Sequence, residues 1–431
     1  QNNCILVEAV VINTHICQKK VSQTKPMFWF CLQVFFLLAL FGFINNAHAS
    51  SVKDLESQKI NEILFNIHTY YVDDLALHNS EYIEYNTSQF ERLYSKLDPY
   101  SKYLDKNELN ALFDNTNGRY TGLGIEVKNI EQRTTIVKVI NNSPAKQVGL
   151  RAGDIITAVN NQQIKNSPID IVAQQIKDSP NNKVQLSIIR NNNLKPLIFN
   201  LSRKQIKLAS VTKQLLDAGS GYIAINTFSN HTLHEVALQI AAMQNHYGHA
   251  LKGLIIDLRD NPGGTLKSAV AVADLFLQDG LIVTTKGRFY DSNQSFYAKR
   301  GDILKGAPIV VLINENSASA AEILAAALKE NMRAKIVGSQ SFGKGSVQSL
   351  IPLGDGDTAL KLTTARYFTP SGESIEGIGV TPNVAINQTT LPQTNKAVII
   401  KNEQSQQNSV FNAEELADIQ LVKAKQLLSM Q

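Results

Sequence analysis

A serine at the start of a helix-forming segment is the first candidate for chemistry. In Asn314-Glu-Asn-Ser317-Ala-Ser319-Ala320-Ala-Glu322, an apolar strand runs into a loop that enters a helix at Ser319. Backbone N–H groups at a helix N-terminus point outward at its positive end. Ser319 could therefore be a nucleophile, with the neighbouring amide facing an oxyanion. The structural alternative is strong, because Ser-x-x-Glu is also the capping-box pattern, in which the serine only caps the helix.

A lysine between two glycines is a candidate general base. Lys344 lies on a predicted turn between two strands, 25 residues after Ser319. An uncharged amine there could accept a serine proton, and Ser–Lys is an attested variant of the serine–histidine arrangement. Gln348 follows on the next predicted strand, on the face of Lys344, where it could orient the amine. A surface lysine on a turn is the structural alternative.

The same segment partly fits a phosphate-binding loop. Residues 338–344 match the first seven positions of the pattern GxxxxGK[ST]. The eighth position is Gly345, so the hydroxyl that would hold magnesium is missing, and a strand is expected to follow instead of a helix. Phosphate binding is therefore the weaker interpretation.

A glycine-rich turn provides a further candidate amide donor. An apolar strand ends at Asp257-Leu-Arg259 and is followed by Asn-Pro-Gly-Gly and a predicted helix, within GLIIDLRDNPGG, residues 253–264. Two glycines after a proline let the backbone approach a ligand closely and present an N–H. Such an amide could stabilise the oxyanion of acyl transfer, although an ordinary turn and helix cap is equally compatible. Asp257 and Arg259 are expected to form a structural ion pair.

Histidine and cysteine are poorly placed for catalysis. No histidine lies beside the serine or glycine segments, and His231 and His234, three residues apart on a predicted helix, have no companion carboxylate motif. We expect surface histidines, and neither a metal nor a cofactor. All three cysteines precede residue 50, which leaves the expected mature chain without a disulfide, a thiol nucleophile or a thiolate zinc site.

The N-terminal region has the pattern of an export signal. Three lysines precede the apolar segment Phe28 to Ile44, and Ala47-His-Ala49 follows as a small-x-small cleavage pattern. This order is typical of a signal peptide, so we expect cleavage after Ala49 and a periplasmic or cell-envelope location. A retained membrane anchor is the alternative, although the segment is short for one. Because the chain begins with Gln, residues 1–20 are treated as a candidate over-extension of the reading frame.

Composition and patterning predict a globular α/β protein of several domains. The 431 residues are 43% hydrophobic, and the net charge of +5 comes without basic runs, which disfavours a nucleic-acid partner. Residues 50–116 are predicted as an N-terminal helical module and 117–204 as a small β domain. In 205–385, apolar strands alternate with helices, which indicates a buried, mostly parallel sheet. Residues 386–431 are predicted as a polar linker and a C-terminal helix.

Taken together and in order, these segments resemble the carboxyl-terminal processing peptidases, also called tail-specific proteases. The resemblance spans about residues 60–385 and rests on LDPYSKYL, TGLGIEV, SPAKQVGLRAGD, DLRDNPGG, NENSASAAE, SFGKGSVQ and LKLTTARYFTPSG. It implies an α/β core like that of the crotonases and Clp proteases, with an inserted PDZ domain.

Position by position, the resemblance also implies site roles. Ser319 matches the nucleophile, Lys344 the general base and Gln348 the residue that orients the lysine. The amides of Ala320 and Gly264 match the oxyanion hole, with Gly263 as the alternative if the register is one residue off. The expected activity is that of a serine endopeptidase working through an acyl-enzyme.

The TGLGIEV segment predicts how substrates are bound. The amides of Leu123, Gly124 and Ile125 are expected to hold a peptide's C-terminal carboxylate, while the following strand edge pairs with the peptide. The resemblance implies protein or peptide substrates gripped at or near their C-termini, with an adaptor protein and a homo-oligomer as further candidate partners. Two alternatives stay open: a catalytically silent PDZ scaffold of the cell envelope, and a crotonase-like enzyme acting on an acyl thioester.

Overall fold

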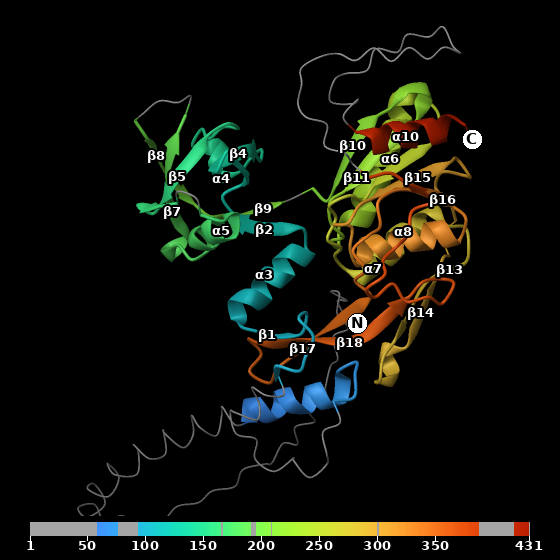
Figure 1. Ribbon diagram of the computed structural model, residues 1–431, viewed down its shortest axis with the longest axis horizontal. Helices are drawn as coiled ribbons and strands as arrows, with labels where there is room; N and C mark the ends of the chain where they lie inside the picture. Colours follow the sequence, from blue (N-terminus) through green and yellow to red (C-terminus); the bar gives the residue numbers. More distant parts are fainter. Residues whose placement is uncertain are drawn as a thin grey trace, which may run out of the picture. The chain divides into compact units, whose positions relative to one another are not determined.

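The chain forms two compact units, Asn110–Ser210 and the remainder (Figure 1). The computed structural model describes residues 58–75, 94–164, 167–190, 195–207, 209–299, 301–387 and 418–430. The expected signal peptide and its cleavage position lie outside these residues. Within them, no helix has both the length and the apolar character needed to cross a bilayer.

The smaller unit is built on an antiparallel sheet. Its strand order is β3 (Ile125–Ile130), β4 (Arg133–Val139), β5 (Ile155–Val159), β7 (Lys183–Ile189) and β8 (Leu197–Ser202), with β6 (Gln162–Gln163) paired to β5. A separate pair joins β2 (Arg119–Gly122) to β9 (Lys204–Lys207), and the helices are α4 (Pro144–Gln147) and α5 (Ile169–Lys177). Alternate residues of β7 are buried, as expected for a sheet with one face in the core.

The larger unit contains a six-stranded sheet that is parallel except at one edge. Its order is β10 (Val211–Leu215), β11 (Gly221–Ile225), β12 (Leu254–Asp257), β15 (Ile309–Ile313), β16 (Ala334–Gly338) and β19 (Val384–Ala385), with β10 antiparallel. Every residue of β12 and β15 is buried, because helices cover both faces of the sheet. The continuous apolar runs in the sequence reflect this double burial.

One face of this sheet packs against α6 (Thr232–Tyr247), α7 (Leu266–Phe276) and α8 (Ala320–Glu330) in the main hydrophobic core. The other face, which includes Ile255, Val310 and Val337, packs against α10 (Ile419–Ser429) near the C-terminus. Successive strand residues point to opposite faces, which is why neighbours such as Val310 and Val311 belong to different clusters.

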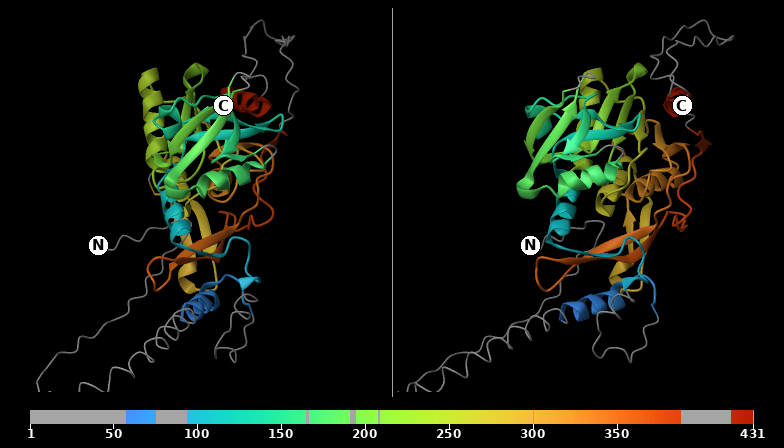
Figure 2. Two further views of the ribbon diagram at one scale, coloured as in Figure 1. Left: turned by 90° about the vertical axis from the view of Figure 1, so that its left-hand side faces the viewer. Right: turned by 60° about the vertical axis from the view of Figure 1, so that its left-hand side comes forward.

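A second, antiparallel sheet carries the N-terminal residues of the larger unit. Its order is β1 (Lys102–Leu104), β18 (Ala359–Phe368), β13 (Leu281–Lys286) and β14 (Gln294–Tyr297), with β17 (Ser346–Pro352) also paired to β18. Residues 58–70 are helical and pack through Ile63 and Ile67 against Leu360 and Leu362 of β18. Figure 2 shows this helix alongside β17 and β18 from two further directions. The segment 94–105 is attached to this sheet through the pairing of β1 with β18.

Candidate active site

Ser319 occupies a strained turn between β15 and α8. It precedes the first residue of α8 and is 4% exposed, with a φ of 55° and a ψ of −115°. A positive φ is unfavourable for a residue with a side chain and costs about 1–3 kcal/mol, and such strain gathers at functional sites. Sharp, strained strand-to-helix turns hold the nucleophile in the α/β-hydrolases.

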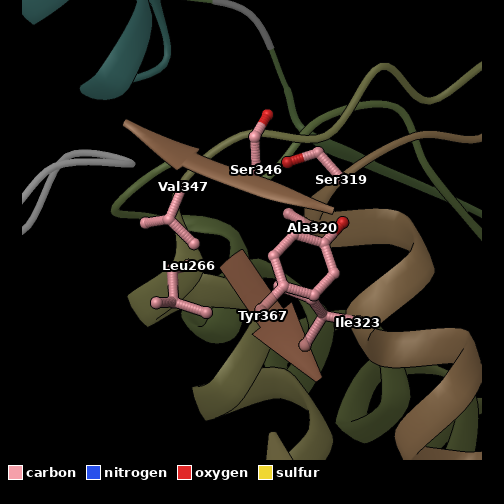
Figure 3. A pocket seen from close by; sticks show the side chains of 7 residues that line it. All are labelled: Leu266, Ser319, Ala320, Ile323, Ser346, Val347 and Tyr367. Atoms are coloured by element: carbon pink, nitrogen blue, oxygen red, sulfur yellow. The ribbon is translucent and has the colours of Figure 1, made fainter. Parts of the chain in front are cut away.

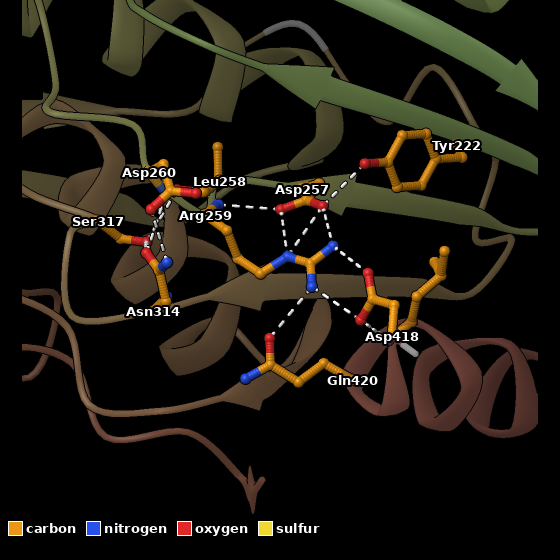
Figure 4. A network of polar contacts seen from close by, with 10 residues as sticks. Tyr222, Asp257, Leu258, Arg259, Asp260, Asn314, Ser317, Asp418 and Gln420 are labelled. Carbon is orange, nitrogen blue, oxygen red and sulfur yellow. Dashed lines mark hydrogen bonds and ion pairs between the residues drawn. The ribbon is translucent and has the colours of Figure 1, made fainter. Parts of the chain in front are cut away.

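The loop that carries Ser319 is tied to the glycine-rich turn after β12. The Ser317 hydroxyl donates to the Leu258 carbonyl at 2.8 Å, and the Ala318 amide donates to the Asn261 carbonyl at 2.9 Å. The Asp260 carboxylate accepts further bonds from two asparagine side chains of the serine loop, at 2.8 and 2.9 Å. Two segments more than fifty residues apart in sequence are thereby held as one unit, part of which Figure 4 shows.

The two glycines of this turn have different hydrogen bonds. The Gly263 amide donates to Asn261 Oδ1 at 2.8 Å, and a Cβ at Gly263 would lie 2.9 Å from Ser319 Cβ. Glycine is therefore required for the close approach of the turn to the serine. No hydrogen bond joins the amide of Gly264 or of Ala320 to another residue of the described ranges. Both N–H groups are available to a substrate oxygen.

Lys344 lies in the loop before β17. Its ammonium nitrogen is 4.8 Å from the centre of the Tyr100 ring, within the range of a cation–π contact. Its carbonyl accepts a hydrogen bond from the Tyr367 hydroxyl. Burial raises the pKa of Tyr100, and nearby carboxylates raise it further, so the ring stays an uncharged phenol around neutral pH. Because β17 begins at Ser346, strand alternation does not relate Lys344 to Gln348 as expected.

Gln348 is buried on β17 with an unused acceptor. Its side chain is 1% exposed, and its Nε2 donates to Ser346 Oγ at 3.1 Å and to Thr363 Oγ1 at 3.2 Å. Its Oε1 has no hydrogen-bond partner among the described residues. Buried polar atoms are nearly always paired, so Gln348 Oε1 is able to accept a hydrogen bond from a further donor.

Glu322 joins the serine and lysine segments. This fully buried carboxylate accepts four hydrogen bonds, from the Ser319 amide at 2.7 Å, Ser341 Oγ at 2.6 Å, the Gly343 amide at 2.7 Å and the Lys344 amide at 2.9 Å. Burial raises the pKa of Glu322 above its ordinary value, against the opposing effect of these bonds. The sequence predicts Glu322 only as part of a helix cap, and the signal for a further role is a charged residue within the apolar stretch 320–328.

Replacing Glu322 with glutamine is expected to reduce activity about 10-fold or more. All four partners are donors, so the amide nitrogen of glutamine would face a donor and leave a buried N–H unsatisfied, at a cost of about 1–3 kcal/mol. Steady-state peptide hydrolysis measures the effect, with Glu315→Gln as a control, since Glu315 is exposed in the same loop. Wild-type activity in Glu322→Gln would show that this carboxylate does not position the site.

A small apolar pocket lies next to Ser319. Its volume is about 10 Å³, roughly that of one water-sized group. Figure 3 shows the hydroxyl of Ser319 at its rim, turned toward the side of Ser346. The lining residues are Leu266, Ser319, Ala320, Ile323, Ser346, Val347 and Tyr367. A small apolar group of a substrate would fit beside Ser319.

In the smaller unit, the predicted carboxylate-binding segment leads into a sheet edge. Leu123 and Gly124 precede β3 and accept backbone bonds through their carbonyls, from the amides of Ala145 and Ile140 at 3.0 and 2.9 Å. Ile125 is the first residue of β3, which is the terminal strand of its sheet. The outer edge of β3 is where an added peptide strand would pair.

The remaining polar residues considered in the sequence form an ion pair or lie at the start of a helix. Asp257 and Arg259 form the expected ion pair, with Arg259 Nη2 2.6 Å from Asp257 Oδ2. His231 and His234 lie at the start of α6. Among the described residues, no three His, Cys, Asp or Glu side chains gather as metal ligands would.

Comparison with known proteins decides the family. The profile of peptidase family S41 matches residues 219–386, and a PDZ domain profile matches residues 121–201. A carboxy-terminal-processing protease of Bartonella bacilliformis is 42% identical over 301 residues, which cover 70% of this chain and 69% of that protein. The chain belongs to peptidase family S41. A carboxyl-terminal-processing protease of Synechocystis sp. is 34% identical over 306 residues, 69% of this chain and 70% of its relative.

Structural comparison agrees with the S41 assignment. The photosystem II D1 C-terminal processing protease has 27% sequence identity and a TM-score of 0.52, over 78% of this chain and 94% of that one. An S41 protease structure from Bacteroides fragilis shares the fold at 15% identity, with a TM-score of 0.51 over 76% of this chain and 90% of that chain.

The S41 assignment confirms the family and fold expected from the sequence, an α/β peptidase with a PDZ domain. The protein is a serine-type peptidase, and the expectation of an enzyme is confirmed. Protein or peptide substrates follow from a protease that carries a PDZ domain.

Proposed function

We propose that this peptidase is an endopeptidase that cleaves proteins recognised at or near their C-termini, with Ser319 as nucleophile and Lys344 as general base. The observation that carries the proposal is the setting of Ser319, which is buried, strained and packed against a glycine turn at the N-terminus of α8. A serine that served only as a helix cap would have no need of a positive φ.

The reaction begins with proton transfer from Ser319 Oγ to the uncharged amine of Lys344. The serine oxygen attacks a peptide carbonyl, and the tetrahedral intermediate collapses to an acyl-enzyme as the ammonium returns the proton to the leaving amine. Water then attacks the ester, losing a proton to Lys344, which returns that proton to Ser319 Oγ as the new C-terminus is released. Gln348 Oε1, buried and unpartnered, supports a role in holding the amine during these transfers.

The amides of Gly264 and Ala320 are proposed to stabilise the oxyanion. Both N–H groups lack a partner among the described residues, whereas the Gly263 amide already bonds to Asn261 and the Ser319 amide to Glu322. This difference supports Gly264 over Gly263, the alternative left open by the sequence. Two preorganised amides aimed at developing charge are a major source of rate enhancement in acyl transfer.

Recognition of the substrate C-terminus is expected to depend on its free carboxylate. We propose that the amides of Leu123, Gly124 and Ile125 hold this group while the peptide pairs with β3. An unstructured polypeptide that ends in a carboxamide should therefore be cleaved with a kcat/KM about 10-fold or more below that of the free acid. Competition between the two forms in one reaction, followed by mass spectrometry, measures the ratio.

An N-acetylated form of the same polypeptide is the matched control, because it removes a terminal charge at the other end and should be cleaved like the parent. Equal cleavage of the free acid and the carboxamide would refute C-terminal recognition while leaving the peptidase chemistry intact.

Export is a further proposal, supported by the order of charged, apolar and small residues before residue 50. It puts the enzyme in the periplasm or cell envelope, by a cleaved signal or, if that is retained, an anchor. An adaptor protein and self-association also remain predictions from the family resemblance.

A further inference from the structure

The C-terminal helix α10 completes the core of the catalytic unit. Ala424 is fully buried against the face of the parallel sheet that α6, α7 and α8 leave uncovered. The half-buried side chains of Leu421, Leu427 and Leu428 pack on the same cluster. These apolar contacts hold α10 against the sheet and so fix the position of its first turn.

The first turn of α10 is joined to the end of β12 by an ion-pair network. Arg259 donates to Asp418 at 2.9 Å from Nη1 and 2.8 Å from Nη2, across 159 residues of sequence. The same guanidinium donates to Asp257, which also accepts a bond from the Tyr222 hydroxyl at 2.8 Å. Figure 4 shows this Arg259 network, formed by Tyr222, Asp257, Arg259, Asp418 and Gln420.

Asp418 has two roles within this network. Besides binding Arg259, its Oδ1 accepts a hydrogen bond from the Leu421 amide at 2.9 Å and so caps α10. Burial alone would raise the pKa of Asp418, but the bonds from Arg259 and from helix amides outweigh burial and hold the pKa below its ordinary value. The carboxylate is therefore charged at neutral pH, opposite a guanidinium that is 15% exposed.

The Arg259 network ends where the glycine turn begins. Arg259 is followed directly by Asp260, which has a φ of 57°, and then by Asn261, whose side chain accepts from the Gly263 amide. Arg259 is held on both sides, by Asp257 at the end of β12 and by Asp418, the N-cap of α10. Its placement therefore sets the direction in which the backbone enters the turn that leads to Gly264.

We propose that Asp418 is a positioning residue for the reaction: through Arg259, it holds the glycine turn in the conformation that directs the Gly264 amide toward the oxyanion. The C-terminal helix is then part of the catalytic apparatus, although it contacts no reacting atom. This inference rests on the proposed oxyanion role of Gly264.

Asp418→Asn tests the proposal with the least disturbance. Asparagine keeps an oxygen that can accept from the Leu421 amide. It replaces the other carboxylate oxygen, which binds Arg259, with an NH2 group and removes the negative charge. We expect kcat to fall about 10-fold, with KM changed less than 2-fold, when hydrolysis of an unstructured peptide is measured well below the unfolding temperature. Inhibition by a peptide aldehyde, whose adduct with Ser319 places an oxygen in the oxyanion site, should weaken in parallel.

A double-mutant cycle between Asp418 and Arg259 distinguishes a positioning role of Asp418 from a general effect on the stability of the fold. If Asp418 acts through Arg259, the double variant Asp418→Asn/Arg259→Lys should lose much less activity than the product of the two single losses. Asp418→Glu, which restores the carboxylate, should recover part of the lost kcat. Gln426→Ala on the exposed side of α10 is the control and should behave as wild type.

An unchanged kcat in Asp418→Asn would overturn the proposal, whether or not the unfolding temperature falls, because α10 would then only cover the sheet. A loss confined to KM, or single losses that multiply independently, would also overturn it. Failure of the proposed function looks different, since cleavage would then be absent from the wild type or would persist in Ser319→Ala.

Discussion

Replacing Ser319 with alanine is expected to lower kcat by about 10⁴-fold or more, leaving only the effect of substrate binding and oxyanion stabilisation. Alanine removes the attacking oxygen but keeps the buried Cβ and the backbone bonds of the turn. The variant should therefore fold like the wild type. Incubation with an unstructured polypeptide, with products identified by mass spectrometry, measures the loss.

Ser339→Ala serves as the matched control, because this serine lies beyond the end of β16 and bonds to the exposed Glu315. It should retain full activity. Cleavage at the wild-type rate in Ser319→Ala, at the same peptide bonds, would remove Ser319 from the mechanism.

Replacing Lys344 should cause a loss of similar size, because the serine hydroxyl would have no acceptor for its proton. Lys344→Met keeps the length of the side chain without a basic nitrogen. Lys344→Arg keeps a cation for the Tyr100 ring, but a guanidinium stays protonated and cannot act as a base. Both variants are expected to lose about 10³-fold or more in kcat, measured with the same polypeptide.

The arginine variant decides between two roles for Lys344. If the cation–π contact with Tyr100 were its whole purpose, Lys344→Arg would remain active and the general-base assignment would fail.

Local sequence patterns were sufficient to predict the elements around Ser319. The apolar run before Asn314 predicted a buried strand, and Ser-x-x-Glu predicted a helix start, which the structure has at Ala320. The sequence left capping and nucleophilic roles as alternatives for Ser319. In the structure Ser319 is the N-cap of α8, and its amide donates to the Glu322 carboxylate as in a capping box, so the capping position and a nucleophilic role are compatible.

Contacts between distant segments could not be predicted in the same way. The bonds from Glu322 to the lysine loop, and from Arg259 to Asp418, depend on how strands and helices pack, which no local pattern records. The orphaned oxygen of Gln348 likewise appears only once its neighbours on β17 and β18 are known. Alternation along a strand was the wrong argument for relating Gln348 to Lys344. Lys344 lies before β17, in the loop that Glu322 binds, so the alternation of strand residues does not apply to it.

A crystal structure of the enzyme with a peptide aldehyde bound to Ser319 tests the central claim most directly. The account predicts that Lys344 Nζ lies within hydrogen-bond reach of Ser319 Oγ and of Gln348 Oε1. It also predicts that the adduct oxygen faces the amides of Gly264 and Ala320. An adduct on Ser319 with the Lys344 amine far from the serine oxygen would contradict the proposed mechanism.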